Sequence, residues 1–258
     1  MLTSLFDLSG KTAVVVGGTT GIGREIALGF ADAGASVIAS SRRPDQVQRM
    51  AAELEARGSR TLAIPSDVTD RSSLVALRDR ALEAFGAVDI LINSAGRIKR
   101  TPTLALSEEE WCGIIDTNLT GAFRACQIFG EPMLERGWGR IINIVSLSNF
   151  VGLYEVAAYG ASKAALGSLT RSLAVEWSSR GVLVNAIAPG VFRTTINADL
   201  LDNTARGREF LVRTPMGRFG RTEELVGAAV YLSSEAASFV TGQILAVDGG
   251  FLASGVNS

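Results

Sequence analysis

The amino-acid sequence predicts an α/β fold in which one doubly wound parallel sheet is flanked by helices on both faces. Apolar β-branched runs alternate with helical patterns along nearly all of the 258 residues, which is typical of parallel sheets. The runs Ala-Val-Val-Val at 13–16 and Ile-Ile-Asn-Ile-Val at 141–145 are continuous, as in strands buried on both sides. Hydrophobic residues make up 47% of the chain, enough for a sizeable core. We therefore expect a single domain spanning residues 1–258.

Each expected element follows from its local pattern. Short apolar runs rich in Val, Ile and Thr predict strands. In chain order these strands are 12–17, 36–41, 60–65, 88–93, 140–145, 183–188 and 243–247. Apolar residues recurring every three or four positions predict helices. These helices are 22–33, 46–57, 72–85, 107–136, 157–179 and 223–233.

The segment 189–221 interrupts this alternation, because it contains only a weak helical pattern. Long insertions in compact domains are usually functional lids or disordered loops. The apolar spacing of Leu200, Leu201, Phe210 and Leu211 favours a lid. We expect a substrate lid at about 190–221.

Composition excludes several classes of function. With 25 Lys and Arg against 26 Asp and Glu, the net charge of −1 gives no reason to expect nucleic acid or an anionic membrane as partner. No apolar stretch approaches the ~20 residues of a membrane span. The absence of histidine excludes Ser-His triads and His-ligated zinc, and we expect no metal. Cys112 and Cys126 cannot form a disulfide framework, which fits a cytoplasmic protein.

A glycine-rich turn directly follows the first expected strand, with Gly17, Gly21 and Gly23 spaced as G-x-x-x-G-x-G, and Ile22 opens the next helix. Glycines allow a close backbone approach, and a helix N-terminus attracts the pyrophosphate of a dinucleotide. A plain tight turn is the alternative. The position after the first strand of an alternating α/β chain favours nucleotide binding and a Rossmann-type fold.

The second expected strand ends in Ser41, followed by Arg42 and Arg43, and no carboxylate occurs from 36 to 44. In dinucleotide folds an acidic residue here suits NAD, whereas an arginine suits the 2′-phosphate of NADP. Forked guanidinium donors match a phosphate group. We expect NADP as the cofactor, with NAD as the alternative. A basic surface turn remains an alternative for Arg43.

Asp67 and Asn93 lie where the third and fourth expected strands end, at the edge of the sheet where open α/β folds bind ligands. Both are candidates for contact with the cofactor. A turn role for Asp67 is equally open. So is a buried amide that ties strand ends together for Asn93.

Tyr159 and Lys163 are four residues apart in the expected helix 157–179, so they share one face of it. An ammonium beside a phenol lowers the phenol's pKa from its usual ~10, and we expect this for Tyr159. Such a phenol exchanges protons with an alcohol or ketone near neutral pH. Taken alone, the pair is more often one aromatic residue and one solvated lysine.

Asn118 occupies a position where the expected helix 107–136 calls for a hydrophobic residue. The apolar stripe of that helix consists of Trp111, Ile115, Ala122, Cys126, Phe129 and Met133. A buried amide is costly without a partner, so we expect Asn118 to have one. The alternative is an amide bonded to the backbone that bends the helix near Gly121.

Together these residues resemble the short-chain dehydrogenase/reductase family over nearly the whole chain. The shared motifs are Gly17-x-x-x-Gly21-x-Gly23, Asn93-Ser94-Ala95-Gly96, Asn118, Ser146, Tyr159-x-x-x-Lys163, Asn185 with Pro189-Gly190, and Asp248-Gly249-Gly250. Two positions depart from the family pattern. Val16 replaces a threonine and Ser94 replaces an asparagine, and both changes remove a structural hydrogen bond.

The resemblance implies a role for each candidate catalytic residue. Tyr159 is the general acid in ketone reduction and the base in alcohol oxidation, and Ser146 polarises the carbonyl oxygen. Lys163 tunes Tyr159 and holds the nicotinamide ribose, while Asn118 anchors a water of a proton relay. Thr194 matches the position that contacts the nicotinamide carboxamide. Further cofactor contacts are implied at Val68, Ala95, Gly96, Pro189 and Gly190.

Substrate specificity is suggested by the stretches 97–100, 213–218 and 247–253, which are most like the gluconate 5-dehydrogenase and deoxygluconate dehydrogenase branch. The resemblance implies NADP(H)-dependent interconversion of a secondary alcohol and a ketone on a sugar acid or similar small polar carbonyl compound. Arg97, Lys99 and Arg100 are expected near the mouth of the cleft, where they attract a carboxylate. Because these charges also suit an acyl carrier protein, 3-oxoacyl-(acyl carrier protein) reductase is the alternative. A non-catalytic dinucleotide sensor is a further one.

The helices 107–136 and 157–179 carry more apolar residues than one sheet contact needs. The residues in question are Phe123, Phe129, Leu166, Leu169 and Leu173. Exposed apolar patches usually mark interfaces, and family members are commonly homotetramers. We expect a homotetramer that buries these helices.

Overall fold

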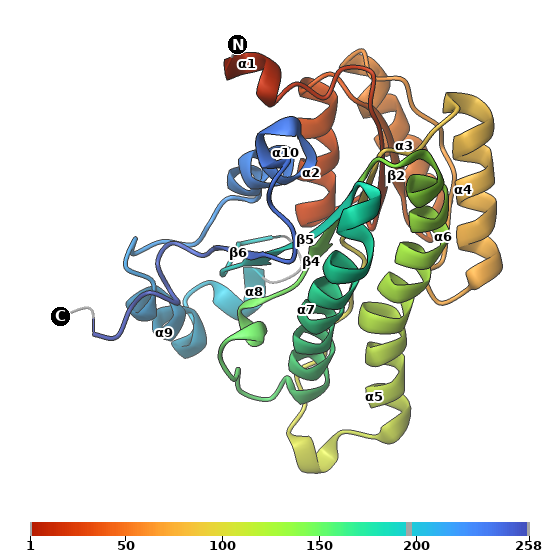
Figure 1. Cartoon of the computed structure of the whole chain (residues 1–258). Helices are drawn as coiled ribbons and strands as arrows, with labels where there is room; N and C mark the ends of the chain where they lie inside the picture. Colours follow the sequence, from red (N-terminus) through yellow and green to blue (C-terminus); the bar gives the residue numbers. More distant parts are fainter. Residues whose placement is uncertain (1, 195–197, 257–258) are drawn as a thin grey trace.

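The computed structural model describes residues 2–194 and 198–256, which form a six-stranded, all-parallel sheet in the order β2-β1-β3-β4-β5-β6 (Figure 1). The strands are β1 (Thr12–Val16), β2 (Ser36–Ser40), β3 (Ile90–Asn93), β4 (Gly139–Ile144), β5 (Val182–Pro189) and β6 (Ile244–Val247). The expected fold class is therefore confirmed. The chain runs outward from β1 to β2 and then returns to place β3 on the other side of β1, so the strand order reverses between β1 and β3.

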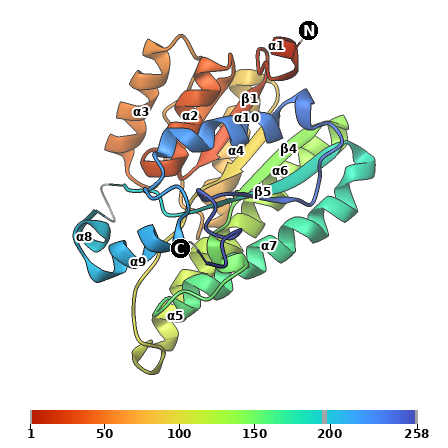
Figure 2. The same cartoon turned by 90° about the vertical axis from the view of Figure 1, so that its left-hand side faces the viewer.

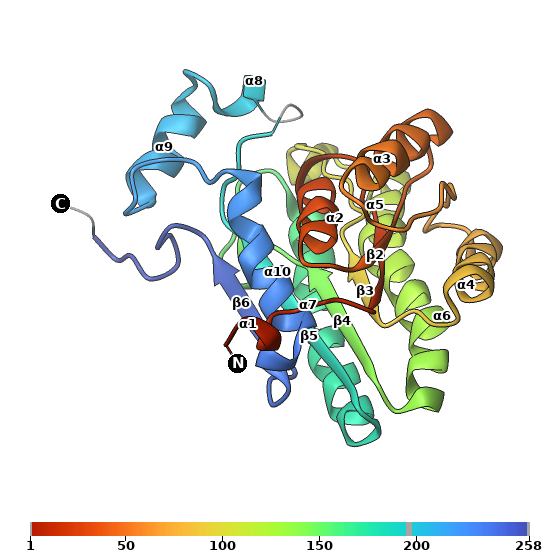
Figure 3. The same cartoon turned by 90° about the horizontal axis from the view of Figure 1, so that it is seen from above.

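Helices cover both faces of the sheet, as the views in Figures 2 and 3 show. The helices of the described chain are α1 (Leu2–Leu5), α2 (Gly21–Asp32), α3 (Pro44–Ala56), α4 (Arg71–Phe85), α5 (Glu108–Ile115), α6 (Gly121–Arg136), α7 (Ala157–Trp177), α8 (Ala198–Leu201), α9 (Ala205–Arg213) and α10 (Val226–Ser233). Helices α2, α3 and α10 share one core, and α4, α6 and α7 share the other. Among the described residues no helix is long and apolar enough to cross a membrane.

Alternation along the strands divides the core into these two layers. In β1 the side chains of Ala13 and Val15 enter the core with α2, whereas Val14 and Val16 enter the core with α4 and α6. Successive side chains of a strand point to opposite faces, so a strand covered on both faces must be apolar at every position. All five residues of β1 are buried, as the continuous run predicts.

The strand expected at 60–65 is not formed, and this expectation is wrong. The segment runs beside β2 but exchanges only two backbone hydrogen bonds there, from Val37 N to the Arg60 carbonyl and from Ser66 N to the Ser41 carbonyl. Pro65 has no N–H to donate, and the Ile64 carbonyl accepts from the Ser40 hydroxyl instead of a ladder amide. β2 therefore forms the last regular strand on this side of the sheet.

The helical region expected at 107–136 is divided by a π-helical turn at Asp116–Thr120, between α5 and α6. Asn118 lies in this turn and is fully buried. The wider turn places its amide toward the chain segment that follows β3. Trp111, expected on the buried stripe, is instead 40% exposed, because α5 extends beyond the edge of the core.

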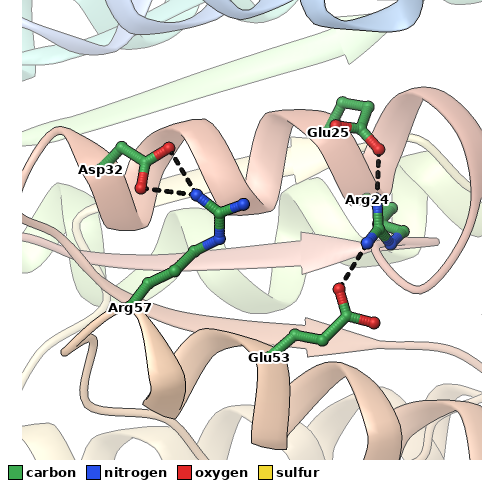
Figure 4. Close-up of polar contacts among 5 residues, drawn as sticks. All are labelled: Arg24, Glu25, Asp32, Glu53 and Arg57. Carbon is green, nitrogen blue, oxygen red and sulfur yellow. Dashed lines mark hydrogen bonds and ion pairs between the residues drawn. The ribbon is translucent and has the colours of Figure 1, made fainter.

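Ion pairs connect α2 to α3 on the outer surface (Figure 4). Arg24 contacts both Glu25 and Glu53, and Arg57 binds Asp32 at 2.8 Å. Exposed pairs of this kind contribute little to stability, typically about 0–1 kcal/mol each. Their consequence is positional, because α3 starts directly after Arg43 and its packing on α2 fixes the turn that carries Arg42 and Arg43.

The apolar residues that suggested an interface are mostly part of the chain's own core. Phe129, Leu166 and Leu173 are at most 6% exposed and pack against the sheet, so they form no outer patch. Phe123 is 38% exposed. This part of the argument for a homotetramer is wrong, because a long helix lying on a twisted sheet buries more than one narrow stripe.

Candidate functional site

A cavity of about 960 Å³ opens at the carboxyl ends of the strands, where β1, β3, β4 and β5 all end. This is the place where the strand order reverses, and open α/β sheets bind ligands there. One wall is the turn after β1, and the facing wall includes α7. The segments after β3 and β5 complete the lining, together with α8 and α9.

The glycine turn between β1 and α2 has the geometry of a pyrophosphate site. Gly17 has a φ of 81°, and a Cβ on it would lie 2.5 Å from the backbone nitrogen of Ala95. Gly21 has a φ of 55°, and a Cβ there would meet nothing within 4 Å. Thr20 precedes α2 without a side-chain capping bond, so the helix N-terminus is available to an anion. Gly23 lies beneath the turn, where a Cβ would come within 2.2 Å of the Gly17 carbonyl.

Ser41, Arg42 and Arg43 lie at the far end of the same cavity. The hydroxyl of Thr19, inside the glycine turn, donates to the Ser41 hydroxyl at 2.8 Å and so joins the two turns. Both arginines are exposed, and in the described part of the chain neither is paired with a carboxylate. Two free guanidinium groups beside a helix N-terminus fit a phosphate on the adenosine ribose.

Asp67 and Val68 line the cavity, whereas the side chain of Asn93 does not. Asp67 Oδ1 accepts from the backbone and the hydroxyl of Thr69, so this carboxylate holds its own turn. Asn93 is buried and donates to Asn143 Oδ1 at 2.8 Å, which ties the ends of β3 and β4 together. For Asn93 the structural alternative describes the observed side chain, and the residues that follow it, Ser94, Ala95 and Gly96, line the cavity.

Tyr159, Lys163 and Ser146 converge on the cavity wall from two elements. Tyr159 and Lys163 occupy successive turns of α7, with Lys163 Nζ 5.9 Å from the centre of the Tyr159 ring. Ser146 follows β4, is 8% exposed, and its hydroxyl accepts from Ser148 N at 3.2 Å. Lys163 is 4% exposed, and its ammonium donates to the Ile144 carbonyl at 2.7 Å.

The pKa of Tyr159 is raised, so the expectation that Lys163 lowers it is wrong for this structure. Burial of the phenol dominates because it disfavours the charged phenolate, and hydrogen bonding to Ser146 only partly opposes it. Burial also lowers the pKa of Lys163 to about 8. At neutral pH the Tyr159 phenol is therefore protonated, and in most molecules the Lys163 ammonium is still charged.

Asn118 is buried and has partners, as its position on the helix predicts. Its Oδ1 accepts from Arg97 N at 2.8 Å, and its Nδ2 donates to the Arg97 carbonyl and to Ser162 Oγ. Ser162 in turn donates to the Tyr159 carbonyl at 2.7 Å. The amide thus connects the segment after β3 to the start of α7. It is bonded to backbone next to a bend before Gly121, as the alternative interpretation states.

Pro189 ends β5, Gly190 and Thr194 follow it, and all three line the cavity. A Cβ on Gly190 would lie 2.5 Å from Asp248 Cα, so this position accepts only glycine without movement. Part of the expected lid, residues 195–197, lies outside the described residues. The described remainder contributes Leu201, Arg206 and Phe210 to the cavity.

The three cations expected at the cleft mouth are only partly available. Lys99 pairs with Glu110 at 2.5 Å and Arg100 pairs with Glu155 at 2.6 Å. Arg97 lines the cavity, with Glu110 3.9 Å away. Opposite charges brought together by the fold thus neutralise two of the three positions.

Sequence reasoning missed Thr19, Ser162 and Arg206. Thr19 lies within the glycine motif, and Ser162 directly precedes Lys163 and lies three residues after Tyr159, so spacing on a helix would have pointed to it. Arg206 gave no comparable indication, because nothing local in its sequence distinguishes it from Arg208 two residues later.

The fold and the site define a dinucleotide-dependent oxidoreductase. A family model described as enoyl-(acyl carrier protein) reductase matches residues 16–252. The 2-dehydro-3-deoxy-D-gluconate 5-dehydrogenase of Bacillus subtilis is 42% identical over 255 residues, 97% of this chain and 98% of that protein. The 3beta-hydroxysteroid dehydrogenase 1 of Eggerthella lenta is 42% identical over 248 residues, 95% of this chain and 94% of that protein.

A crystal structure of a gluconate 5-dehydrogenase from Burkholderia cenocepacia, in complex with NADP and tartrate, superposes with a TM-score of 0.95. It is 35% identical in sequence, and the match covers 99% of this chain and 100% of that one. The chain therefore belongs to the short-chain dehydrogenase/reductase family and is an NAD(P)-dependent oxidoreductase. The resemblance inferred from its motifs is confirmed.

Proposed function

We propose that this enzyme uses NADP(H) to interconvert a secondary alcohol and a ketone on a sugar acid. The observation that carries the proposal is the convergence of Ser146, Tyr159 and Lys163 on the cavity that begins at the glycine turn. Relatives named for gluconate and deoxygluconate support the substrate class. The Burkholderia cenocepacia relative holds NADP together with tartrate, a dicarboxylic acid.

The residues present fit the dinucleotide. Gly21, where a Cβ would meet nothing within 4 Å, leaves the backbone at the start of α2 open to the pyrophosphate, and Gly17 and Gly23 allow the turn to pack closely. Arg42 and Arg43 line the same cavity and would hold the 2′-phosphate. When bound, the nicotinamide supplies or accepts the hydride. Lys163 has further donors for the nicotinamide ribose beyond its bond to Ile144, because an ammonium carries three.

Tyr159 donates the proton to the carbonyl oxygen during ketone reduction. A raised pKa keeps its phenol protonated at neutral pH, which suits an acid more than a base. Ser146 donates a hydrogen bond to the same oxygen and polarises the carbonyl, while the Lys163 ammonium stabilises the phenolate that Tyr159 becomes. Asn118 positions α7 and the segment after β3 and anchors a water of the proton relay.

The decisive experiment is oxidation of NADPH with a panel of carbonyl substrates. The panel contains a 5-keto sugar acid, a neutral diketone and a 3-oxoacyl thioester. We expect the sugar acid to have the highest kcat/KM. Preference for the thioester would favour the alternative, 3-oxoacyl-(acyl carrier protein) reductase. Turnover of none of them would favour a dinucleotide sensor.

We also propose that residues 1–258 act as one domain in which α8 and α9 form the lid over the substrate. Leu201 and Phe210 of these helices line the cavity, so substrate should protect them. Hydrogen exchange with and without NADP and a sugar acid measures this. Equal protection of 198–213 in both states would mean that these helices are a fixed wall.

We propose a cytoplasmic homotetramer, for which the free thiols Cys112 and Cys126 and the exposed Leu245 on β6 give support. β6 is the last strand of the sheet on its side, and its apolar residues are poorly covered within the chain. Sedimentation at micromolar concentration checks the assembly, and a monomer alone would contradict it.

A further inference from the structure

Arg206 lines the cavity and, among the residues that the structure describes, forms no ion pair with a carboxylate. It lies on α9, and its two terminal nitrogens donate long hydrogen bonds of 3.3 and 3.4 Å to the Tyr154 carbonyl. Its Nε is buried and has no hydrogen-bond partner among the residues that the structure describes. A guanidinium has five N–H donors, so most of the capacity of Arg206 remains unused.

Arg206 is partly buried, and even partial burial of a charge without a paired carboxylate is unfavourable. Burial and the nearby Arg100 both lower its pKa, with Glu155 and Glu209 attracting it only at longer range. Glu155 itself is occupied by Arg100 at 2.6 Å. Within the described chain, no carboxylate therefore forms an ion pair with Arg206.

The guanidinium is also held in place. Its carbon lies 5.4 Å from the centre of the Phe210 ring, one helical turn along α9. Phe210 packs in turn against Phe251 with 6.3 Å between ring centres. A planar donor fixed on an aromatic face, with N–H groups still unbonded, is prearranged for a planar anion.

We propose that Arg206 binds the carboxylate of the substrate and thereby selects sugar acids over neutral carbonyl compounds. This proposal rests on the proposed function and names the residue that gives it its specificity. Each terminal nitrogen carries two N–H groups, so donors remain for the two oxygens of a carboxylate beside those that bind the Tyr154 carbonyl. A site built to hold a charged group strongly disfavours analogues that lack it.

The test compares a 5-keto sugar acid with its neutral amide as substrates for reduction by NADPH. Three variants are measured. Arg206→Met removes the charge and keeps the bulk, Arg206→Lys keeps the charge without the fork, and Arg208→Met is the matched control. Arg208 lies on the same helix, is exposed, and donates to the Asn203 carbonyl at 3.2 Å, its one hydrogen bond among the described residues.

We expect Arg206→Met to lower kcat/KM for the acid by roughly 100-fold while changing that for the amide by less than about threefold. Arg206→Lys should lose at least about tenfold on the acid because it cannot bind in a bidentate manner. Arg208→Met should match the wild type. An unchanged ratio of acid to amide in Arg206→Met, or in Arg206→Lys if the first variant does not fold, would overturn the proposal.

A binding measurement separates this proposal from the proposed function. Calorimetric titration of the 5-keto acid into the enzyme with NADP reports affinity without turnover. Binding to the wild type that Arg206→Met abolishes would support the role of Arg206 even if no sugar acid were turned over. Equal affinity in both proteins, or no binding to the wild type, would reject it.

Discussion

Replacement of Lys163 by methionine should stabilise the protein at neutral pH while destroying its activity. Lys163 is 4% exposed, and its pKa falls from 10.5 to about 8 because burial penalises the ammonium. A group whose folded pKa lies below its unfolded value opposes folding when it is charged. At pH 7 Lys163 is charged in both states, so the full cost is present there.

The magnitude follows from the difference between the two pKa values. At about 1.4 kcal/mol for each pH unit, burial of the charge costs about 3 kcal/mol. Methionine also loses the hydrogen bond to the Ile144 carbonyl, which contributes about 1 kcal/mol. The variant should therefore be more stable than the wild type by about 2 kcal/mol at pH 7. Between about pH 8 and ~10.4 the unfolded chain binds more protons than the folded one, so the wild type becomes more stable as the pH rises. The stability advantage of Lys163→Met over the wild type therefore disappears across this range.

Urea unfolding at intervals from pH 7 to pH 10 measures the effect, with Lys99→Met as the control. Lys99 is exposed, so its replacement relieves no burial of a charge. Reduction of a good ketone should fall at least ~10²-fold in Lys163→Met, since the ammonium supports both Tyr159 and the ribose. Parallel stability curves for the variant and the wild type would refute the argument that burial of this charge is costly.

Two further substitutions test the acid and the cofactor preference. Tyr159→Phe should keep the fold and NADPH binding but lower kcat at least ~10²-fold. The control Tyr154→Phe, at an exposed residue five positions earlier, should be active. Near-normal ketone reduction by Tyr159→Phe would refute the assignment of Tyr159 as the proton donor. Arg42→Ala should weaken NADPH by about 1.5–3 kcal/mol and NADH far less, as fluorescence titration would show, with Arg49→Ala as the control on α3. Equal losses for both cofactors would contradict the role of Arg42.

The fold could be predicted from the sequence wherever a segment is buried on both faces. β1 is apolar except at Thr12, and β4 contains Ile141, Ile142 and Ile144, as is typical of the central strands of a parallel sheet. The segment 60–65 carries similar residue types but runs along the edge, where Ala63 and Pro65 are exposed. Composition alone cannot tell whether a partner strand completes the ladder, so the prediction failed there.

The candidate site was predictable in its residues and less so in its electrostatics. Spacing on a helix places Tyr159 beside Lys163, because that relation is local. The direction of the Tyr159 pKa depends on burial by segments distant in the chain, which spacing does not report. The same holds for Lys99 and Arg100, whose carboxylate partners Glu110 and Glu155 are 11 and 55 positions away.

Asn118 shows how a local pattern and a tertiary contact combine in this site. The helical stripe predicts that its amide is buried, and burial requires partners. The fold supplies them as Arg97, through both backbone groups, and Ser162, which binds the Tyr159 carbonyl. Both N–H groups of Nδ2 and the Oδ1 oxygen are thus used in joining the segment that follows β3 to the start of α7. Because Gly96 and Tyr159 line the cavity from these two elements, the position of the proton donor relative to the cofactor wall depends on one buried side chain.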